Sequence, residues 1–296
     1  MSILHFRIVI LSCLFMLFLL PTIWHDTRGI KVDTRITDIA IGNSHARAIH
    51  FGSMKLVGYN GYVGGADIRE TLNQYRILKK VFPNVQRIWI PLAPVALYRD
   101  KATQKFARES QFLNNIFDMY FFWESDFVRL LSTGKDALKF FKSRIPPIEQ
   151  AEDEFVLEGA RHSNVVLDTD SLQNLADKTA SIHAQTASLA HVANKRRLKV
   201  LVQDANKRGI EVILFIPPFT EQYFNHKLLS EFTRHYNQDL SEFSKRYDGV
   251  YFFDFNNQFG EADMRLFYDD DHLNFAGAQV FSPILFRTFS SKSSVK

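Results

Sequence analysis

Cysteine is almost absent from this chain of 296 residues, because the single one, Cys13, lies inside an apolar run near the amino terminus. The rest of the chain therefore has no thiol that could form a disulfide or hold a metal. Internal repeats and low-complexity tracts are missing as well. These absences exclude a disulfide framework and a cysteine-based zinc site.

A strong charge of either sign is also missing. The chain has 36 basic and 32 acidic residues, and the net charge of +4 is spread along its length. Such a weak excess does not indicate nucleic-acid binding. With 46% hydrophobic and 23% charged residues, the composition is that of a globular protein with one large domain or two ordinary ones.

The longest apolar run lies at the amino terminus, from Ile8 to Leu20, and continues to Trp24. Its length falls between that of a signal-peptide core and that of a full membrane span. No small-x-small cleavage site follows it, and a tryptophan at its end suits the membrane interface. We therefore expect an uncleaved signal anchor rather than a cleaved signal peptide, which is the alternative.

The expected organisation has three parts. Residues 1–25 form the anchor, which contacts the membrane through residues 6–24, and residues 26–35 form a polar tether. The remainder, 36–296, is one α/β domain, which we expect outside the cytoplasm. The basic residues that flank the anchor are too few to fix its orientation by charge alone.

Short apolar runs recur along this domain and alternate with helical patterns. Continuous rather than alternating hydrophobicity is typical of strands that are buried on both faces. The alternation predicts a parallel sheet with helices on both sides. The expected strands are 36–41, 55–57, 87–90, 210–216 and 250–253, and the expected helices begin at Asp67 and cover about 198–208 and 228–247.

Between the third and fourth expected strands this alternation of strands and helices is interrupted. Only the short run at 164–168 resembles a strand between residues 90 and 210, so residues of about 100–209 are predicted to form a large helical insertion. Parts of it are unusually aromatic. These aromatic side chains either pack against the sheet or form an exposed patch for the membrane or a partner.

A serine follows the first expected strand, in the sequence Gly42-Asn43-Ser44-His45. Gly42 permits a tight turn, and a serine at a strand-to-helix turn presents its hydroxyl away from the sheet. Its own N–H then helps to form an oxyanion hole. Taken alone, this pattern also fits a serine that only caps a helix.

A second polar cluster, Asp269-Asp270-Asp271-His272, stands before the last expected helix. The spacing of Asp269 and His272 allows one loop to offer a carboxylate to the imidazole while the imidazole reaches a serine elsewhere. An acidic surface turn and a metal site are the alternatives. We expect neither a metal nor another cofactor, because the other histidines, such as His183, form no second cluster in the sequence.

Together these motifs resemble the SGNH/GDSL hydrolase superfamily. The matching pieces are Gly42 to His45, the glycine block in "GYNGYVGGAD", and Asp269 to His272. The resemblance spans residues 36 to about 290 apart from the insertion. It implies a flavodoxin-like three-layer sandwich around a five-stranded parallel sheet, and serine-based ester hydrolysis or acyl transfer.

The resemblance also implies roles for individual residues. Ser44 would be the nucleophile, His272 the general base and Asp269 its orienting carboxylate. The second-block glycine, which lends an N–H to the oxyanion, best matches Gly65, with Gly64 as the alternative. His45 and Tyr223, the latter in "FIPPFTEQY", are candidates for substrate contact, although structural roles fit them as well.

One element of the family pattern is missing. The third strand runs into "IPLAPVALYRD", which lacks the asparagine that normally completes the oxyanion hole. Loss of one such donor typically costs about 10²- to 10³-fold in rate. The departure is similar to what membrane-anchored SGNH-like proteins of cell-envelope O-acylation show.

The sequence thus predicts a membrane-tethered serine esterase or O-acyltransferase. Its substrate would be an acylated or acyl-accepting cell-envelope glycan. The alternative is a non-catalytic SGNH-like scaffold that binds a membrane acyltransferase partner through the aromatic insertion. The intact Ser44, Asp269 and His272 favour the enzyme, whereas the missing asparagine favours the scaffold.

Overall fold

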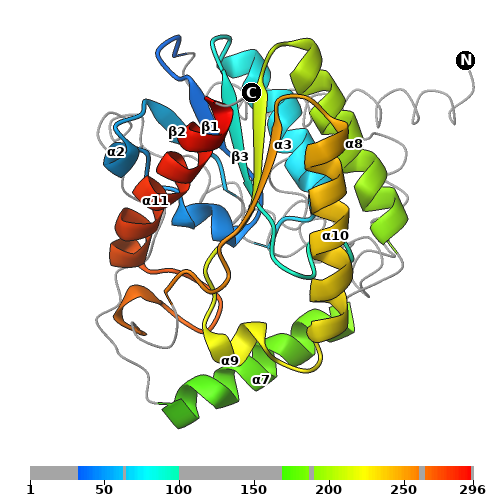
Figure 1. The fold of residues 1–296 in the computed structure, drawn as a ribbon, viewed down its shortest axis with the longest axis vertical. Coiled ribbons are helices and arrows are strands. Elements are labelled where there is room, and N and C mark those ends of the chain that lie inside the picture. Colours follow the sequence, from blue (N-terminus) through cyan, green and yellow to red (C-terminus); the bar gives the residue numbers. More distant parts are fainter. Residues whose placement is uncertain (1–32, 63–64, 100–168, 187–189, 260–263, 295–296) are drawn as a thin grey trace, which may run out of the picture.

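The computed structural model describes residues 33–62, 65–99, 169–186, 190–259 and 264–294 (Figure 1). Five parallel strands form one sheet in the order β2-β1-β3-β4-β5. Helices cover both faces, so the predicted three-layer, flavodoxin-like α/β fold is confirmed. The strands are β1 (Asp38–Ala40), β2 (Gly58–Asn60), β3 (Arg87–Pro91), β4 (Glu211–Ile216) and β5 (Val250–Asp254).

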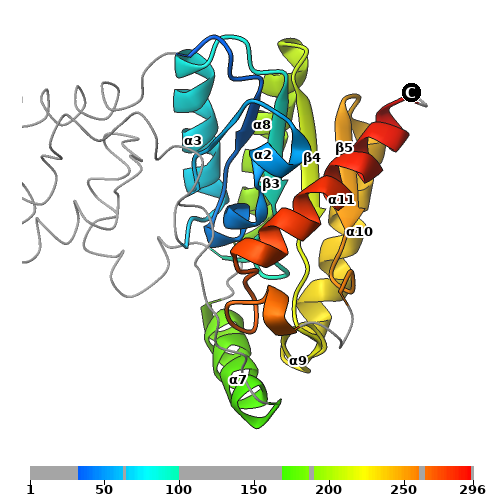
Figure 2. The same ribbon diagram turned by 90° about the vertical axis from the view of Figure 1, so that its left-hand side faces the viewer.

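The two faces of the sheet bury different sets of side chains, as the alternation along a strand requires. In β3, for example, Ile88 and Ile90 face the helices α3, α8 and α10, whereas Trp89 faces α2 and α11. Figure 2 shows α3 and α11 on opposite sides of the strands. These helices are α2 (Phe51–Met54), α3 (Ile68–Val81), α8 (His191–Lys207), α10 (Ser230–Arg246) and α11 (Phe275–Ser293).

The first strand lies next to the central strand β3, and the strand order reverses at this point. A buried carboxylate fixes the contact, because Asp38 accepts hydrogen bonds from Arg87 at 2.6 Å and from the Trp89 indole at 2.9 Å. Clefts at the carboxyl ends of such reversed strands are the usual ligand sites of open α/β sheets. Ser44 follows β1 at this edge.

The prediction of a strand at residues 55–57 is wrong by three residues, since the strand is Gly58–Asn60. Lys55 adopts a left-handed conformation with φ of 57° and ends α2. The chain therefore turns where the apolar run suggested an extended segment. Val57 leaves half of its surface, 52%, in contact with solvent.

The helix predicted to begin at Asp67 is confirmed with its capping box. Asp67 accepts from the N–H of Glu70, and the Glu70 carboxylate accepts from the N–H of Asp67, both at 2.9 Å. Helix α8 begins at His191, seven residues before the expected start at 198. Its polar first half, which includes Lys195 and Arg196, hid this start from an argument based on apolar spacing.

The predicted insertion falls largely outside the described residues, as does the strand-like run at 164–168. Helix α7 (Thr169–Thr186) belongs to its described part and lies beside the short helix α9 (Glu221–Phe224), beyond the carboxyl edge of the sheet (Figures 1 and 2). The connection between β3 and β4 thus reaches the edge that carries Ser44. Among the described residues no helix is long and apolar enough to span a membrane, and the expected anchor, 1–25, is not among them.

Candidate active site

Ser44 follows a tight turn at Gly42, which a side chain of α3 holds in place. Gly42 has a φ of 122°, a value that side chains disfavour, and its N–H donates to the Gln74 side chain at 2.6 Å. Asn43 then accepts from the N–H of His45 at 3.1 Å. The helix that follows is shorter than the sequence suggested, because Ser44–Ala48 forms only five residues of 3-10 helix.

A closed loop between the 3-10 helix η4 (Met264–Leu266) and α11 carries the acidic cluster. A bridge between Phe267 and Leu273 and a bond from the N–H of Tyr268 to the carbonyl of His272, at 2.8 Å, hold the two sides of the loop together. A Cβ at Gly277 would lie 2.1 Å from the backbone oxygen of Leu266, so only glycine allows this approach. The loop is therefore held against the start of α11.

The structure brings the three predicted catalytic residues together. Ser44 Oγ lies 2.7 Å from His272 Nε2, and His272 Nδ1 lies 3.0 and 3.1 Å from the two carboxylate oxygens of Asp269. Asp269 also accepts from the N–H of His272 at 2.7 Å, which orients the imidazole. This chain of contacts has the geometry of a nucleophile, base and orienting acid.

A second carboxylate, which the sequence analysis did not assign, also contacts the histidine. Asp271 Oδ1 lies 2.7 Å from His272 Nδ1, closer than either oxygen of Asp269. Asp271 is buried, whereas a quarter of the Asp269 side chain is exposed. The imidazole thus faces two carboxylates, and the buried one makes the shorter contact.

These carboxylates determine the protonation of His272. Burial alone would lower its pKa, but the charge of Asp271 and the hydrogen bonds to Asp269 and Asp271 outweigh burial and raise the pKa to about 10. Burial alone would raise the pKa of Asp271. The charge of His272 and its hydrogen bond to Asp271 outweigh burial and lower this pKa below its usual range. At neutral pH the pair is therefore an imidazolium beside a carboxylate.

His45 is a second imidazole in the site. Its ring stacks on that of His272, with centroids 4.5 Å apart and planes inclined by 15°. Burial, together with the charge of His272, lowers the pKa of His45 to about 3, so this ring is neutral. His45 packs against the expected base and the ring of Phe219 and is itself buried.

Asp270 faces away from the histidine, toward the insertion and the fourth strand. Its backbone oxygen accepts from the hydroxyl of Thr220, and its carboxylate accepts from the hydroxyl of Thr179 on α7. The other carboxylate oxygen is buried and has no hydrogen-bond partner among the described residues. Burial, with the charges of Asp271 and Asp269, raises the pKa of Asp270 to about 7.

Tyr223 lies deeper than the sequence analysis expected for a residue in contact with substrate. It is fully buried, and its hydroxyl lies 2.7 Å from Nδ1 of His183 on α7. Its ring packs against Phe219, with centroids 5.2 Å apart. The pair of Tyr223 and His183 thus joins α9 to the described part of the insertion.

The expected oxyanion glycine, Gly65, has a φ of 69°, which suits glycine. Gly64 lies outside the described residues, so the choice between the two stays a prediction. After β3 the chain continues through Leu92 to Arg99 without an asparagine, as the sequence indicated. Arg99 at the end of this exit reaches toward Gly65, its Nη2 lying 3.9 Å from the position of a Cβ on that glycine.

Two groups of side chains have ligand atoms close enough together to hold a cation: His45 with Asp271 and His272, and Asp269 with Asp270 and Asp271. Several of these side chains already make contacts within the protein. Asp271 faces His272, and Asp269 accepts from the N–H groups of Asp271 and His272. The contacts within the site are those of a histidine with two carboxylates.

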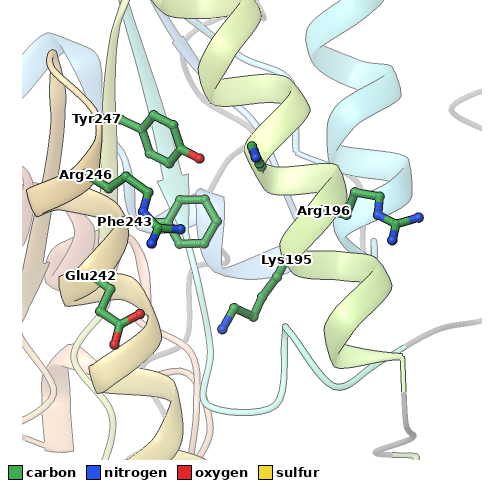
Figure 3. Close-up of a pocket in the computed structure, with 7 residues that line it drawn as sticks. Lys195, Arg196, Glu242, Phe243, Arg246 and Tyr247 are labelled. Atoms are coloured by element: carbon green, nitrogen blue, oxygen red, sulfur yellow. The ribbon is translucent and has the colours of Figure 1, made fainter.

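A hollow of about 230 Å³ lies elsewhere, between α8 and α10 (Figure 3). We call it the basic pocket; it is lined by Lys195, Arg196, Lys199, Glu242, Phe243, Arg246 and Tyr247. Lys195 pairs with Asp239 at 2.6 Å. Arg196, Lys199 and Arg246 are exposed and have no ion pair with any described residue.

Sequence reasoning missed three residues near the triad: Asp271, His183 and Arg99. Asp271 carried a signal, because it is adjacent to the expected base. His183 and Arg99 carried none, since they lie on or beside an insertion whose fold the spacing of apolar residues did not reveal. Comparison with protein-family models and with curated proteins finds no match for this chain, so the resemblance to SGNH hydrolases rests on its motifs and their geometry.

Proposed function

We propose that this chain is a membrane-tethered SGNH-like serine esterase or O-acyltransferase that acts on an acylated or acyl-accepting glycan of the cell envelope. The observation that carries the proposal is the row of contacts from Ser44 Oγ through His272 to the carboxylates of Asp269 and Asp271. The N-terminal apolar run supports the tether and an extracytoplasmic site.

In the proposed reaction Ser44 Oγ attacks the carbonyl carbon of an ester, and His272 Nε2 takes the hydroxyl proton. The π electrons of the carbonyl move to its oxygen. When the tetrahedral intermediate collapses, the leaving alkoxide takes the proton from His272 and an acyl-serine remains. Water or a sugar hydroxyl then attacks this ester, again with His272 as base, and Ser44 regains its proton.

The protonation of His272 limits the rate of the first step. With a pKa of about 10, the imidazole is almost entirely protonated at neutral pH and must lose a proton before it acts as a base. Only a small fraction of the imidazole is neutral at pH 7. This supports slow hydrolysis, or transfer that depends on a bound acceptor or partner, rather than fast general esterase activity.

Labelling by a fluorophosphonate tests the proposal. The full chain in detergent should be modified at Ser44 and should release acetate slowly from a small activated acetyl ester. Ser44→Ala should abolish both, whereas Ser53→Ala, another serine outside the triad, should leave both unchanged. Equal reaction of the native protein and Ser44→Ala would contradict the proposal.

That outcome would favour the second candidate, a non-catalytic scaffold for a membrane acyltransferase. The observation that favours the scaffold is the third-strand exit without an asparagine donor. The scaffold predicts binding to the partner that is insensitive to Ser44→Ala. Rates near those of efficient esterases would instead show that the oxyanion hole is complete.

A further inference from the structure

Arg99 stands at the end of the third-strand exit, the segment in which the expected asparagine is missing. Its backbone is fixed by Asn194 on α8, whose amide donates to the carbonyls of Leu97 at 2.9 Å and Arg99 at 2.7 Å. Asn194 is fully buried, and its side-chain oxygen accepts from Arg197 at 2.7 Å. A core helix thus determines where the Arg99 side chain begins.

The side chain of Arg99 extends toward the proposed oxyanion glycine. Its Nη2 lies 3.9 Å from the position of a Cβ on Gly65, and among the described residues no other atom outside the neighbours of Gly65 comes within 4 Å of that point. Nε of Arg99 is buried and has no hydrogen-bond partner among the described residues. A guanidinium has five N–H donors, so the Nη2 group beside Gly65 is suited to donate to a ligand oxygen.

Arg99 also shares its surroundings with the triad. Its positive charge contributes to lowering the pKa of His183, for which burial is the main cause, and the same imidazole responds to Asp271 and His272. His183 in turn contacts Tyr223. Arg99, Asp271 and His272 therefore all lie within electrostatic reach of His183.

A cation in addition to His272 suits the charge of the site. Asp269, Asp270 and Asp271 are adjacent, and their carboxylate oxygens lie within 4.8 Å of one another. A tetrahedral intermediate would add another negative charge near them, in surroundings where like charges repel strongly. Two backbone N–H groups, from Ser44 and Gly65, carry only partial charges against this repulsion.

We propose that Arg99 donates a hydrogen bond to the oxyanion and replaces the missing asparagine of the third strand. This inference rests on the proposed function and names a further catalytic residue for it. As Ser44 Oγ bonds to the carbonyl carbon, the π pair moves to the carbonyl oxygen, the hydroxyl proton moves to His272, and Arg99 keeps its own proton. Because Arg99 binds the carbonyl oxygen, which every ester has, an uncharged acyl group is sufficient for this interaction.

The test compares Arg99→Gln and Arg99→Lys with the native full chain, on an uncharged acetyl ester and on the fluorophosphonate. Both reactions build negative charge on an oxygen in the transition state. Arg99→Gln should lower kcat and the labelling rate by about 10²- to 10³-fold with little change in KM. Arg99→Lys, which keeps the charge, should recover part of this loss. Arg196→Gln, the same change at an exposed site in the basic pocket, should leave both rates unchanged.

Other outcomes separate the inference from the proposed function. If Ser44 is labelled but Arg99→Gln reacts at the native rate, and thermal unfolding shows that the variant is folded, Arg99 does not stabilise the oxyanion and the proposed function stands. A higher KM for acidic esters alone would overturn the inference in favour of a substrate-anchoring role. Failure of the native chain to label at Ser44 would remove both.

Discussion

Charged side chains gather in two places on this protein, and their surroundings differ. One is the basic pocket, and the other is the carboxyl edge of the sheet around Ser44 and His272, which we call the triad edge. At the triad edge Asp271 and His272 are 2.7 Å apart and Asp271 is buried. In the basic pocket Arg196 and Arg246 are exposed and have no ion pair with a described residue (Figure 3). Charges in low dielectric alter one another's protonation, whereas solvated charges interact weakly and are screened by salt.

The comparison teaches that reactivity depends on burial and pairing rather than on the number of charges. His272 holds its proton up to a pH of about 10 because two carboxylates face it. The basic pocket has more cations, yet water surrounds them. Substitutions that remove one charge should therefore have large effects at the triad edge and small effects in the pocket.

The largest effect is expected from Asp271→Asn. Removal of this carboxylate should lower the pKa of His272 by about 1–3 units, because an opposite charge at contact distance raises a histidine pKa by that amount. The rate of Ser44 labelling, which requires neutral His272, should then rise at lower pH than in the native protein. Labelling measured from pH 6 to 10 gives this profile.

Stability should change in the same variant. In the native protein the raised pKa of His272 contributes stability that is complete below pH 6.5 and is lost as the pH rises toward 10. Asp271→Asn should be less stable than the native protein at pH 6, and the difference should shrink at pH 10. An unchanged labelling profile would show that Asp269 alone controls the base, and Asp269→Asn would then produce the shift.

A smaller effect is expected from Asp270→Asn, which should stabilise the protein, whereas Asp271→Asn should destabilise it. With its pKa raised to about 7, Asp270 keeps its proton in the folded protein but loses it near pH 4 when unfolded, so native stability falls as the pH rises from 4 to 7. Asparagine cannot ionise, so at pH 8 the variant should be more stable than the native protein by on the order of 1–3 kcal/mol.

Urea unfolding at pH 4.5 and pH 8 measures this difference, which should nearly vanish at the lower pH. Asp248→Asn removes an equal charge from an exposed position and is the matched control. If both variants change stability by the same amount at pH 8, the buried oxygen of Asp270 is not the source of the effect.

The smallest effect is expected in the basic pocket. Arg246→Gln should raise the free energy of unfolding by no more than about 0.5 kcal/mol at low salt, because it removes repulsion among exposed cations. In 1 M salt, where charges are screened beyond about 3 Å, the gain should disappear. Arg234→Gln, on the same helix but outside the pocket, should show no such salt dependence, and equal behaviour of the two variants would refute this reading of the pocket.

The sequence was sufficient to predict the fold and to predict that Ser44, Asp269 and His272 lie together. Apolar runs identified four of the five strands to within two residues of their ends, and turn chemistry located the two polar loops. Residue types at fixed spacing suffice here because parallel strands bring their carboxyl ends to one edge. The strand at 55–57 failed because a left-handed residue, Lys55, is not visible in hydrophobicity.

Contacts between distant segments could not be predicted in the same way. The stacking of His45 on His272, the contact of Asp271 with His272 and the approach of Arg99 to Gly65 depend on side-chain positions in the folded protein. Each joins segments whose relative placement no local pattern specifies. Protonation depends on the same positions, so the raised pKa of His272 was also beyond the sequence.

Ser44 and His272 are separated by 228 positions in the chain. Synthesis proceeds from the amino terminus, so the serine emerges long before the histidine. Contacts of such long range form late, because the intervening chain must first be ordered. The contact between Ser44 and His272 would therefore form only when the last helix docks, and a chain still being synthesised would carry a serine without its histidine.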